Sequence, residues 1–223
     1  MCGRYSLTAD GSAIQELFPF LNIPPGMQPR FNIAPSQPVA VIPNDGKLTL
    51  DFFKWGLVPS WSKDPEIGNR LINARAETLG EKPSFRNAFK YHRCLILADG
   101  FFEWTKSNGG KTPMYIRLIS QKPFAFAGLW DTWHAPDGSE LRSCVIITTE
   151  PNQLMEKIHN RMPVILPADK MMPWIDPEPG NLNALSKLLI PFPAEQMTAY
   201  PVSRLVNSPA NDSPECILPI NNP

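Results

Sequence analysis

Short apolar runs with a period of two dominate the chain from residue 39 to residue 149. Valine, isoleucine, phenylalanine and tryptophan are frequent in these runs, and turn-forming residues separate them, as is typical of strands joined by short connections. The centre of the chain is therefore predicted to be mostly sheet. The predicted strands are Val39–Ile42, Leu50–Trp55, Arg70–Arg75, Arg93–Ala98, Phe101–Trp104, Met114–Leu118, Phe124–Leu129 and Arg142–Thr149.

Apolar residues at helical spacing stand nearer to the two ends of the chain. Ser12–Gln15 has the pattern of a capping box, and apolar residues follow it at helical spacing, so we predict a short helix there. Towards the C-terminus the pattern predicts three more helices, over Asn152–Ile158, Ala168–Trp174 and Leu182–Leu189. A last strand is predicted over Met197–Val202.

The order of these elements predicts one α+β domain over residues 1–207, with a curved, barrel-like and mostly antiparallel sheet flanked by short helices. The 26 prolines support this prediction. They make up roughly 12% of the chain against an average near 5%, which favours turns and extended segments. Residues 208–223 form a Pro-rich C-terminal tail that we expect to be loosely ordered.

Composition and charge limit the class of protein. With 43% hydrophobic residues, the 223-residue chain can bury a core and is not a disordered tail. Basic and acidic residues both number 21, so any binding of nucleic acid must depend on a local cluster. No membrane span or signal peptide is recognisable, and we expect a cytoplasmic protein. The cysteines lack the paired spacing of a zinc site, so we expect no metal.

The second residue is a cysteine, and aminopeptidases remove an initiator methionine efficiently when the next residue is small. Cys2 would then carry a thiol and a free α-amine, whose reference pKa is near 7.7–8.0. Such an amine attacks aldehydes, and the neighbouring thiol can close a five-membered thiazolidine ring on the same carbon. The alternative is an incidental cysteine at a frayed terminus.

A polar pair follows an apolar strand at Asn73 and Arg75. Residues two positions apart on a strand point to the same face. Asn73 offers an acceptor and donors, and Arg75 can hold a phosphate. The alternative is a hydrogen-bonded loop asparagine and a surface arginine.

Two further residues are candidates for proton transfer. Glu103 stands among three aromatic residues of the segment Asp99–Trp104, an apolar setting that raises a carboxyl pKa. It can instead be the polar member of an ordinary alternating strand. His159 follows a helical pattern and titrates near neutral pH, although a lone histidine is often structural.

Arginines and an aromatic residue suggest contacts with nucleic acid. Arg4, Arg75 and Arg161 lie in these informative segments, and guanidinium groups suit bidentate phosphate contacts. Trp61 lies in a short polar loop, and with Pro35 it is a candidate for stacking on bases.

Seven short motifs occur in one order along the chain: Met1–Tyr5, Asn32–Pro35, Trp55–Pro59, Ile72–Glu77, Ala98–Trp104, Ile158–Pro163 and Val202–Arg204. Together they resemble the SRAP family, the SOS response-associated peptidases. Each motif is weak alone, but seven in order are highly specific, and they cover residues 2 to about 207.

The resemblance implies a barrel-like α+β fold and a sensor of abasic sites. In this family the mature N-terminal cysteine, here Cys2, forms a covalent thiazolidine crosslink with the ring-opened aldehyde of an abasic site in single-stranded DNA. The crosslink shields the lesion from cleavage and error-prone bypass. By the same resemblance, Asn73 orients the cysteine and the sugar, Glu103 is the acid/base carboxylate, and His159 donates the proton for ring opening and crosslink reversal.

The resemblance also implies DNA contacts. Arg4, Arg75 and Arg161 match phosphate-contacting positions, and Pro35 matches a base-stacking position. Ser62 stands where some members carry a second tryptophan, so the wedge that unstacks a neighbouring duplex is expected to be weaker here. We expect a monomer without a cofactor, which is nucleoid-associated when bound to DNA.

Two other functions compete with this interpretation. An N-terminal cysteine near asparagine, glutamate and histidine side chains could support a thiol peptidase, including one that removes Met1. A non-catalytic single-strand binder would use Trp61 and the arginines, but it would leave Cys2, Glu103 and His159 without a role.

Overall fold

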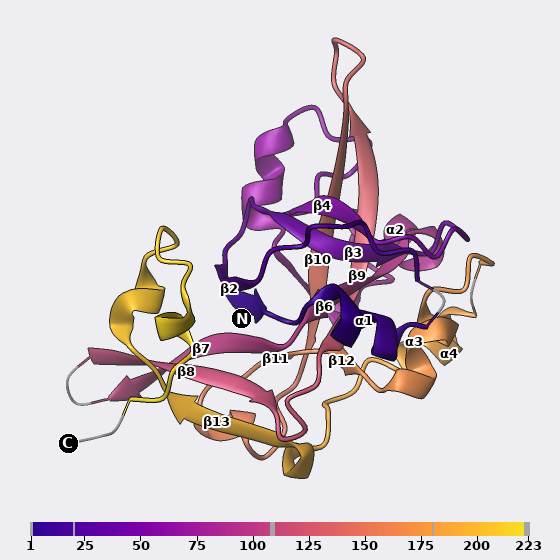
Figure 1. The fold of residues 1–223 in the computed structure, drawn as a ribbon. Helices are drawn as coiled ribbons and strands as arrows, with labels where there is room; N and C mark the ends of the chain where they lie inside the picture. Colours follow the sequence, from indigo (N-terminus) through magenta and orange to yellow (C-terminus); the bar gives the residue numbers. More distant parts are fainter. Residues whose placement is uncertain (1, 20, 108–109, 180, 221–223) are drawn as a thin grey trace.

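Five strands close into a barrel in the computed structural model of the chain, which describes residues 2–19, 21–107, 110–179 and 181–220 (Figure 1). Every pair in this ring is antiparallel except β4 with β10. Closure leaves no free edge in the ring itself. In spatial order the strands are β10(Glu140–Thr149), β4(Asp51–Trp55), β3(Pro38–Pro43), β6(Arg93–Ala98) and β9(Phe124–His134), which pairs again with β10.

A second, antiparallel sheet contains the N-terminal strand. Its order is β13(Met197–Pro201), β8(Gly110–Leu118), β7(Gly100–Ser107), β1(Tyr5–Leu7) and β2(Arg30–Ile33). Three short strands extend the barrel wall: β5(Asn73–Arg75) and β11(Met162–Pro163) on β10, and β12(Ile165–Leu166) on β9. The predicted α+β domain with a curved, barrel-like and mostly antiparallel sheet is confirmed.

Short helices cover the outside of the sheets. In Figure 1, α2, α3 and α4 lie on the right, whereas the N-terminus and β2 lie to the left. No helix within the described residues is long and apolar enough to span a membrane. The α-helices are α1(Gly11–Leu17), α2(Arg86–Tyr91), α3(Ala168–Trp174) and α4(Leu182–Ser186), and the 3₁₀ helices are η1(Pro65–Arg70), η2(Ala76–Thr78), η3(Met155–Lys157), η4(Ala194–Gln196), η5(Arg204–Asn207) and η6(Pro214–Cys216).

Three element predictions need correction. The first helix begins after Asp10 rather than Ser12, because the Asp10 carboxylate accepts the Ala13 amide at 2.9 Å. In the predicted strand Arg70–Arg75, only residues 73–75 pair, since η1 extends to residue 70. The helix predicted over Asn152–Ile158 is reduced to η3, because the chain soon turns to pair as β11.

The C-terminal segment differs from the loosely ordered tail that its prolines suggest, because residues 208–220 pack onto β2. The Asp212 carboxylate accepts a hydrogen bond from the Asn32 backbone amide at 3.0 Å. The Asn32 side-chain amide donates to the Asn211 carbonyl at 2.6 Å. Cys216 of this segment is fully buried and packs with Phe102 and Tyr115 of the second sheet. Hydrogen bonds of the buried Asn32 side chain and of the Asp212 carboxylate hold the segment, and a hydrophobic pattern does not reveal such bonds.

Aromatic side chains join the two sheets. Tyr5 of β1 packs edge-on against Trp55 of β4, with ring centroids 5.2 Å apart, and against Phe126 of β9 at 5.7 Å. All three side chains are buried in the main core. This packing places the residues just before β1 at the junction between the barrel and the second sheet.

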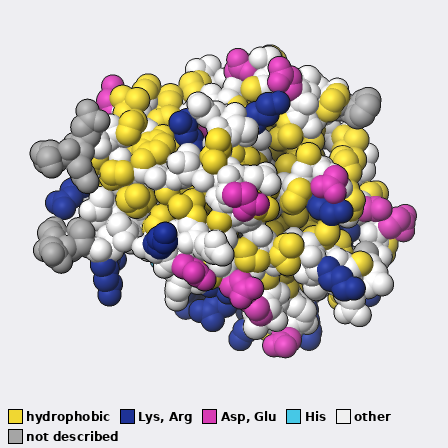
Figure 2. Space-filling view, turned by 90° about the horizontal axis from the view of Figure 1, so that it is seen from below, with side chains coloured by type: hydrophobic (Ala, Val, Ile, Leu, Met, Phe, Trp, Pro, Cys, Tyr) yellow, Lys and Arg dark blue, Asp and Glu magenta, His cyan; other side chains and the backbone are white. Residues whose placement is uncertain are grey.

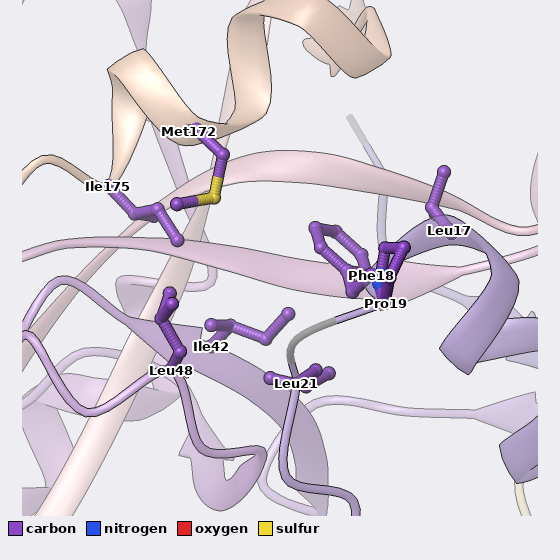
Figure 3. A pocket seen from close by; sticks show the side chains of 8 residues that line it. All are labelled: Leu17, Phe18, Pro19, Leu21, Ile42, Leu48, Met172 and Ile175. Carbon is purple, nitrogen blue, oxygen red and sulfur yellow. The ribbon is translucent and has the colours of Figure 1, made fainter.

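An apolar cavity of about 240 Å³ lies between α1, β3 and α3 (Figure 3). It contains no acid, base or nucleophile among its lining side chains, and it is lined by none of the predicted site residues. The lining residues are Leu17, Phe18, Pro19, Leu21, Ile42, Leu48, Met172 and Ile175.

Candidate functional site

Cys2 lies at the junction of the two sheets, three residues before β1 begins. Its side chain is fully buried, and its Sγ lies 3.8 Å from the Arg4 carbonyl oxygen. Burial, and then the negative charge of Glu103, raise the pKa of the Cys2 thiol. At neutral pH Cys2 is therefore a protonated thiol in this environment.

Asn73 reaches Cys2 from the barrel side. It is the first residue of β5 and stands opposite Ile146 of β10. Its Nδ2 donates to the Cys2 carbonyl oxygen at 2.8 Å. Its Oδ1 is buried and accepts no hydrogen bond from the described residues. One end of the amide thus positions the N-terminal residue, and the other remains an acceptor for a further donor.

Glu103 lies on the second sheet and acts on Cys2 through its charge. It is buried on β7, and its charge is the second cause of the raised Cys2 pKa. The three neighbouring aromatic side chains do not all surround it, because side chains alternate along a strand. Phe101 belongs to the main core with Cys2, whereas Phe102 packs in the smaller cluster on the other face, with Trp104 against it.

Asp99 anchors the strand that follows Cys2, a role that the sequence analysis did not assign. Its carboxylate is buried between the sheets and accepts hydrogen bonds from Ser6 Oγ at 2.6 Å, Thr8 Oγ1 at 2.6 Å and the Ala9 amide at 2.9 Å. The Thr8 amide also donates to it. One carboxylate thus holds four donors of β1 and the following turn, and fixes the position of that strand.

His159 and Arg161 meet at the end of β10. His159 Nδ1 lies 3.0 Å from the Arg161 amide nitrogen and 3.2 Å from the Arg161 carbonyl oxygen, so the backbone of Arg161 fixes the orientation of the ring. The Arg161 guanidinium donates to the Thr148 carbonyl at 2.6 Å. Thr148 stands opposite Arg75 of β5, two residues after Asn73. The fold therefore brings four predicted site residues to one end of the β5–β10 pair, namely Asn73, Arg75, His159 and Arg161.

A carboxylate partner of Arg161 was not anticipated from the sequence. Glu77 forms a bidentate pair with it, with Nη1–Oε1 and Nη2–Oε2 distances of 2.7 and 3.0 Å. The Arg161 guanidinium holds the pKa of the Glu77 carboxyl below its ordinary value. The Glu77 side chain is 50% exposed and that of Arg161 only 16% exposed. Glu77 therefore occupies donors that a phosphate would use.

The three predicted phosphate-binding arginines differ in their surroundings. Arg75 is exposed and pairs with no carboxylate within the described residues. The Arg4 guanidinium, in contrast, donates to Asn32 Oδ1 at 2.8 Å and to the Val206 carbonyl at 2.6 Å. It links the N-terminus to η5.

The two predicted stacking residues lie in different places. Pro35 is half-buried just after β2, and the pairing of Tyr5 with Ile33 directs it towards the residues before β1. Trp61 is 59% exposed and lies in the loop after β4. Ser62 beside it is buried, and its carbonyl accepts a hydrogen bond from Trp133 Nε1 at 2.7 Å.

Charge is distributed without a broad basic field on the face drawn in Figure 2, where basic and acidic side chains are interspersed among hydrophobic ones. The formal net charge of the sequence is zero. Among the described residues, no group of three or more His, Cys, Asp or Glu side chains could hold a metal ion. Local clusters of arginine are thus the candidate anion sites.

Comparison with known proteins bears on this arrangement. Residues 1–209 match the sequence model of the family described as SOS response associated peptidase (SRAP). The chain belongs to the SRAP family. The resemblance seen in the seven sequence motifs is therefore confirmed.

Relatives in this family carry informative names. The chain is 49% identical over 221 residues to the abasic site processing protein YoqW of Bacillus subtilis. The alignment covers 97% of this chain and 99% of that protein. It is 32% identical to the abasic site processing protein HMCES of Xenopus tropicalis, over 86% of this chain and 67% of that protein. A crystal structure of a protein from Bacteroides thetaiotaomicron superposes with a TM-score of 0.88, at 28% identity, over 99% of this chain and 100% of that one.

Proposed function

We propose that this protein captures abasic sites in single-stranded DNA by a covalent thiazolidine crosslink through the mature N-terminal Cys2. The observation that carries the proposal is the convergence of Asn73 and Glu103 on Cys2 from two different sheets. The names of the relatives support the substrate class. Met1 itself lies outside the described residues, and its removal is part of the proposal.

The raised pKa of the Cys2 thiol sets the order of the chemical steps. A neutral α-amine is the better first nucleophile, and it attacks the aldehyde carbon of the ring-opened sugar. The carbinolamine loses water and becomes an imine. The thiol then adds across the C=N bond: a sulfur–carbon bond forms, the sulfur loses its proton and the nitrogen gains one. The overall reaction releases one water.

Each neighbouring group has a defined task in this sequence of steps. Glu103 accepts the thiol proton and returns it to nitrogen, since its charge already acts on the thiol. Asn73 keeps the Cys2 backbone in place, and its buried Oδ1 can accept a hydrogen bond from the amine or a sugar hydroxyl. His159 protonates the ring oxygen of the closed sugar and thereby opens it.

The phosphates flanking the lesion would contact the arginines at the ends of β1 and β5. Arg75 is exposed and ready for a phosphate, whereas Arg161 must share its donors with Glu77. Arg4 holds the strand around Cys2 through its bonds to Asn32 and η5, and offers its remaining donors to DNA. Pro35 would stack on a base near the abasic sugar. Such a protein would act as a monomer in the cytoplasm, at the nucleoid.

The test is to incubate the protein with an abasic oligonucleotide, the same oligonucleotide reduced with borohydride, and an intact one. We expect a denaturation-resistant band only with the unreduced abasic strand, because only that strand has an aldehyde. Intact mass spectrometry should give the sum of mature protein and DNA minus one water. Cys2→Ser should form an imine at most, since a hydroxyl closes the ring poorly. A heat-stable crosslink with Cys2→Ser would refute the thiazolidine.

The contacts around Cys2 also suit a second function, a thiol peptidase that removes Met1. Asn73 binds the Cys2 carbonyl, and Glu103 lies close enough to influence the thiol. Mass spectrometry of Glu103→Gln and Asn73→Ala, produced in cells and compared with the wild type, separates the two functions. If the variants retain Met1 and the wild type does not, the protein removes its own Met1. If the variants lose Met1 normally but fail to form the crosslink, the two residues act in capture.

A further inference from the structure

Residues 206–216, called the clasp below, pack against the edge strand β2 beside the N-terminus (Figure 1). The function proposed above gives residues 208–216 no role. The family model matches residues 1–209, so most of the clasp lies beyond the matched part of the chain. The hydrogen bonds of the clasp nevertheless lead back to Arg4, which is two residues after Cys2.

A single buried side chain connects the clasp to Arg4. Asn32 of β2 is fully buried, and its Oδ1 accepts a hydrogen bond from the Arg4 guanidinium at 2.8 Å. Its Nδ2 faces three carbonyl oxygens of the clasp at 3.3, 3.0 and 2.6 Å, those of Val206, Ser208 and Asn211. Because a side-chain amide carries both an acceptor and donors, Asn32 fixes the Arg4 side chain relative to the clasp.

Asp212 of the clasp fixes Asn32 in turn. Its carboxylate accepts hydrogen bonds from the backbone amides of Phe31 and Asn32, at 2.5 and 3.0 Å. The same carboxylate pairs with Arg30 Nε. Since β2 is the last strand of its sheet, no further strand holds it on that side. The clasp therefore holds the part of β2 that carries Asn32.

The clasp orients Arg4 without neutralising its charge. The two acceptors of its guanidinium, Asn32 Oδ1 and the Val206 carbonyl oxygen at 2.6 Å, are both uncharged. Arg4 forms no ion pair with a carboxylate in the part of the chain that the structure describes. Arg161, in contrast, faces the Glu77 carboxylate. An oriented guanidinium that keeps its positive charge is suited to a phosphate.

The backbone of Arg4 connects this guanidinium to the nucleophile. The Arg4 carbonyl oxygen accepts the Phe102 amide of β7 at 2.9 Å and lies 3.8 Å from Cys2 Sγ. A phosphate bound by Arg4 would therefore lie beside the sugar that Cys2 captures. A long side chain that is ordered before binding avoids a loss of rotamer freedom, which otherwise weakens binding roughly two- to tenfold.

We propose that the clasp is part of the DNA-binding site, and that Asp212 and Asn32 are positioning residues that hold the charged Arg4 guanidinium ready for the phosphate beside the lesion. This inference rests on the proposed function, because that function places the abasic sugar at Cys2. It extends the site to a segment whose prolines suggest a loosely ordered tail.

The test measures the Kd for single-stranded DNA in the Cys2→Ser background, which separates binding from crosslinking. Loss of an acidic side chain alone should favour DNA binding. Glu215→Ala is the matched control, because it removes an exposed carboxylate from the same segment. We expect Asp212→Ala to bind about three- to fivefold more weakly than Glu215→Ala. Asp212→Asn keeps an oxygen for the two amides of β2 and should stay within about twofold of Glu215→Ala.

A double-mutant cycle separates positioning of Arg4 from a general loss of stability. Arg4→Ala should weaken binding about tenfold and lower the slope of log K against log salt by about 0.7. Addition of Asp212→Ala to Arg4→Ala should then weaken binding no further. In the protein that retains Cys2, Asp212→Ala should raise the DNA concentration for half-maximal crosslinking more than it lowers the maximal rate.

Four results would each refute the role of the clasp. They are equal binding by Asp212→Ala and Glu215→Ala, equal losses in Asp212→Ala and Asp212→Asn, full additivity of Arg4→Ala and Asp212→Ala, and unchanged binding by Arg4→Ala. A non-additive loss of binding, without any crosslink in the wild type, would overturn the proposed function and leave the role of the clasp standing.

Discussion

The pairing of Glu77 with Arg161 leads to an uncommon expectation, namely that removal of an acidic residue improves DNA binding. Glu77→Gln would release the guanidinium donors that now face the Glu77 carboxylate at 2.7 and 3.0 Å. A DNA phosphate could then take both of them. Because the Glu77 side chain is 50% exposed, solvent screens the pair. Loss of the Glu77–Arg161 ion pair should make the free energy of DNA binding more favourable by about 0.5–1 kcal/mol.

That free energy corresponds to roughly a two- to fivefold lower Kd. The salt dependence should change as well. If Arg161 takes one further phosphate, the slope of log K against log salt becomes steeper by about 0.7 for a single strand. The assay is fluorescence anisotropy with an intact single-stranded oligonucleotide at several salt concentrations, in the Cys2→Ser background.

The pH dependence follows from the lowered pKa of Glu77. A carboxyl whose pKa is lowered in the folded protein stays ionised above its ordinary value, near 4.3, and the pair is lost only as pH falls through the lower, folded value. The gain from Glu77→Gln should therefore be constant from about pH 5 to pH 8. Glu81→Gln is the control, because it removes an exposed carboxylate that does not pair with Arg161. Equal effects of the two variants, or weaker binding by Glu77→Gln, would refute the competition.

Two further predictions concern the chemistry and the fold. His159→Ala should slow crosslink formation and also slow exchange from a preformed crosslink into excess abasic DNA, whereas Glu103→Ala should chiefly slow formation; wild-type exchange by His159→Ala over hours would make His159 structural. Asp99→Ala should lower the free energy of unfolding by about 3 kcal/mol and the Tm by about 10 °C, since it leaves buried donors of β1 without an acceptor. Thermal and denaturant unfolding test this, with Asp137→Ala on an exposed turn as the control; equal stability of the two variants would contradict the anchoring role.

The sequence alone predicted the strand-rich α+β class, most strand positions and the family. Strands such as β6 and β9 were recognisable because runs of apolar residues are local features. The motifs around Cys2, Asn73 and Glu103 could likewise be read without a structure. These are all properties of a few consecutive residues.

Contacts between distant segments were decided only by the tertiary structure. The pairing of Arg161 with Glu77 joins residues 84 positions apart, and the anchoring of β1 by Asp99 spans about as many. The packing of residues 208–220 on β2 depends on Asn32, far from it in sequence. A side chain's type shows which bonds it can make, but strand register and burial decide which partner it meets. For this reason the candidate residues were predictable, whereas the carboxylate partner of Arg161 and the anchoring of β1 were not.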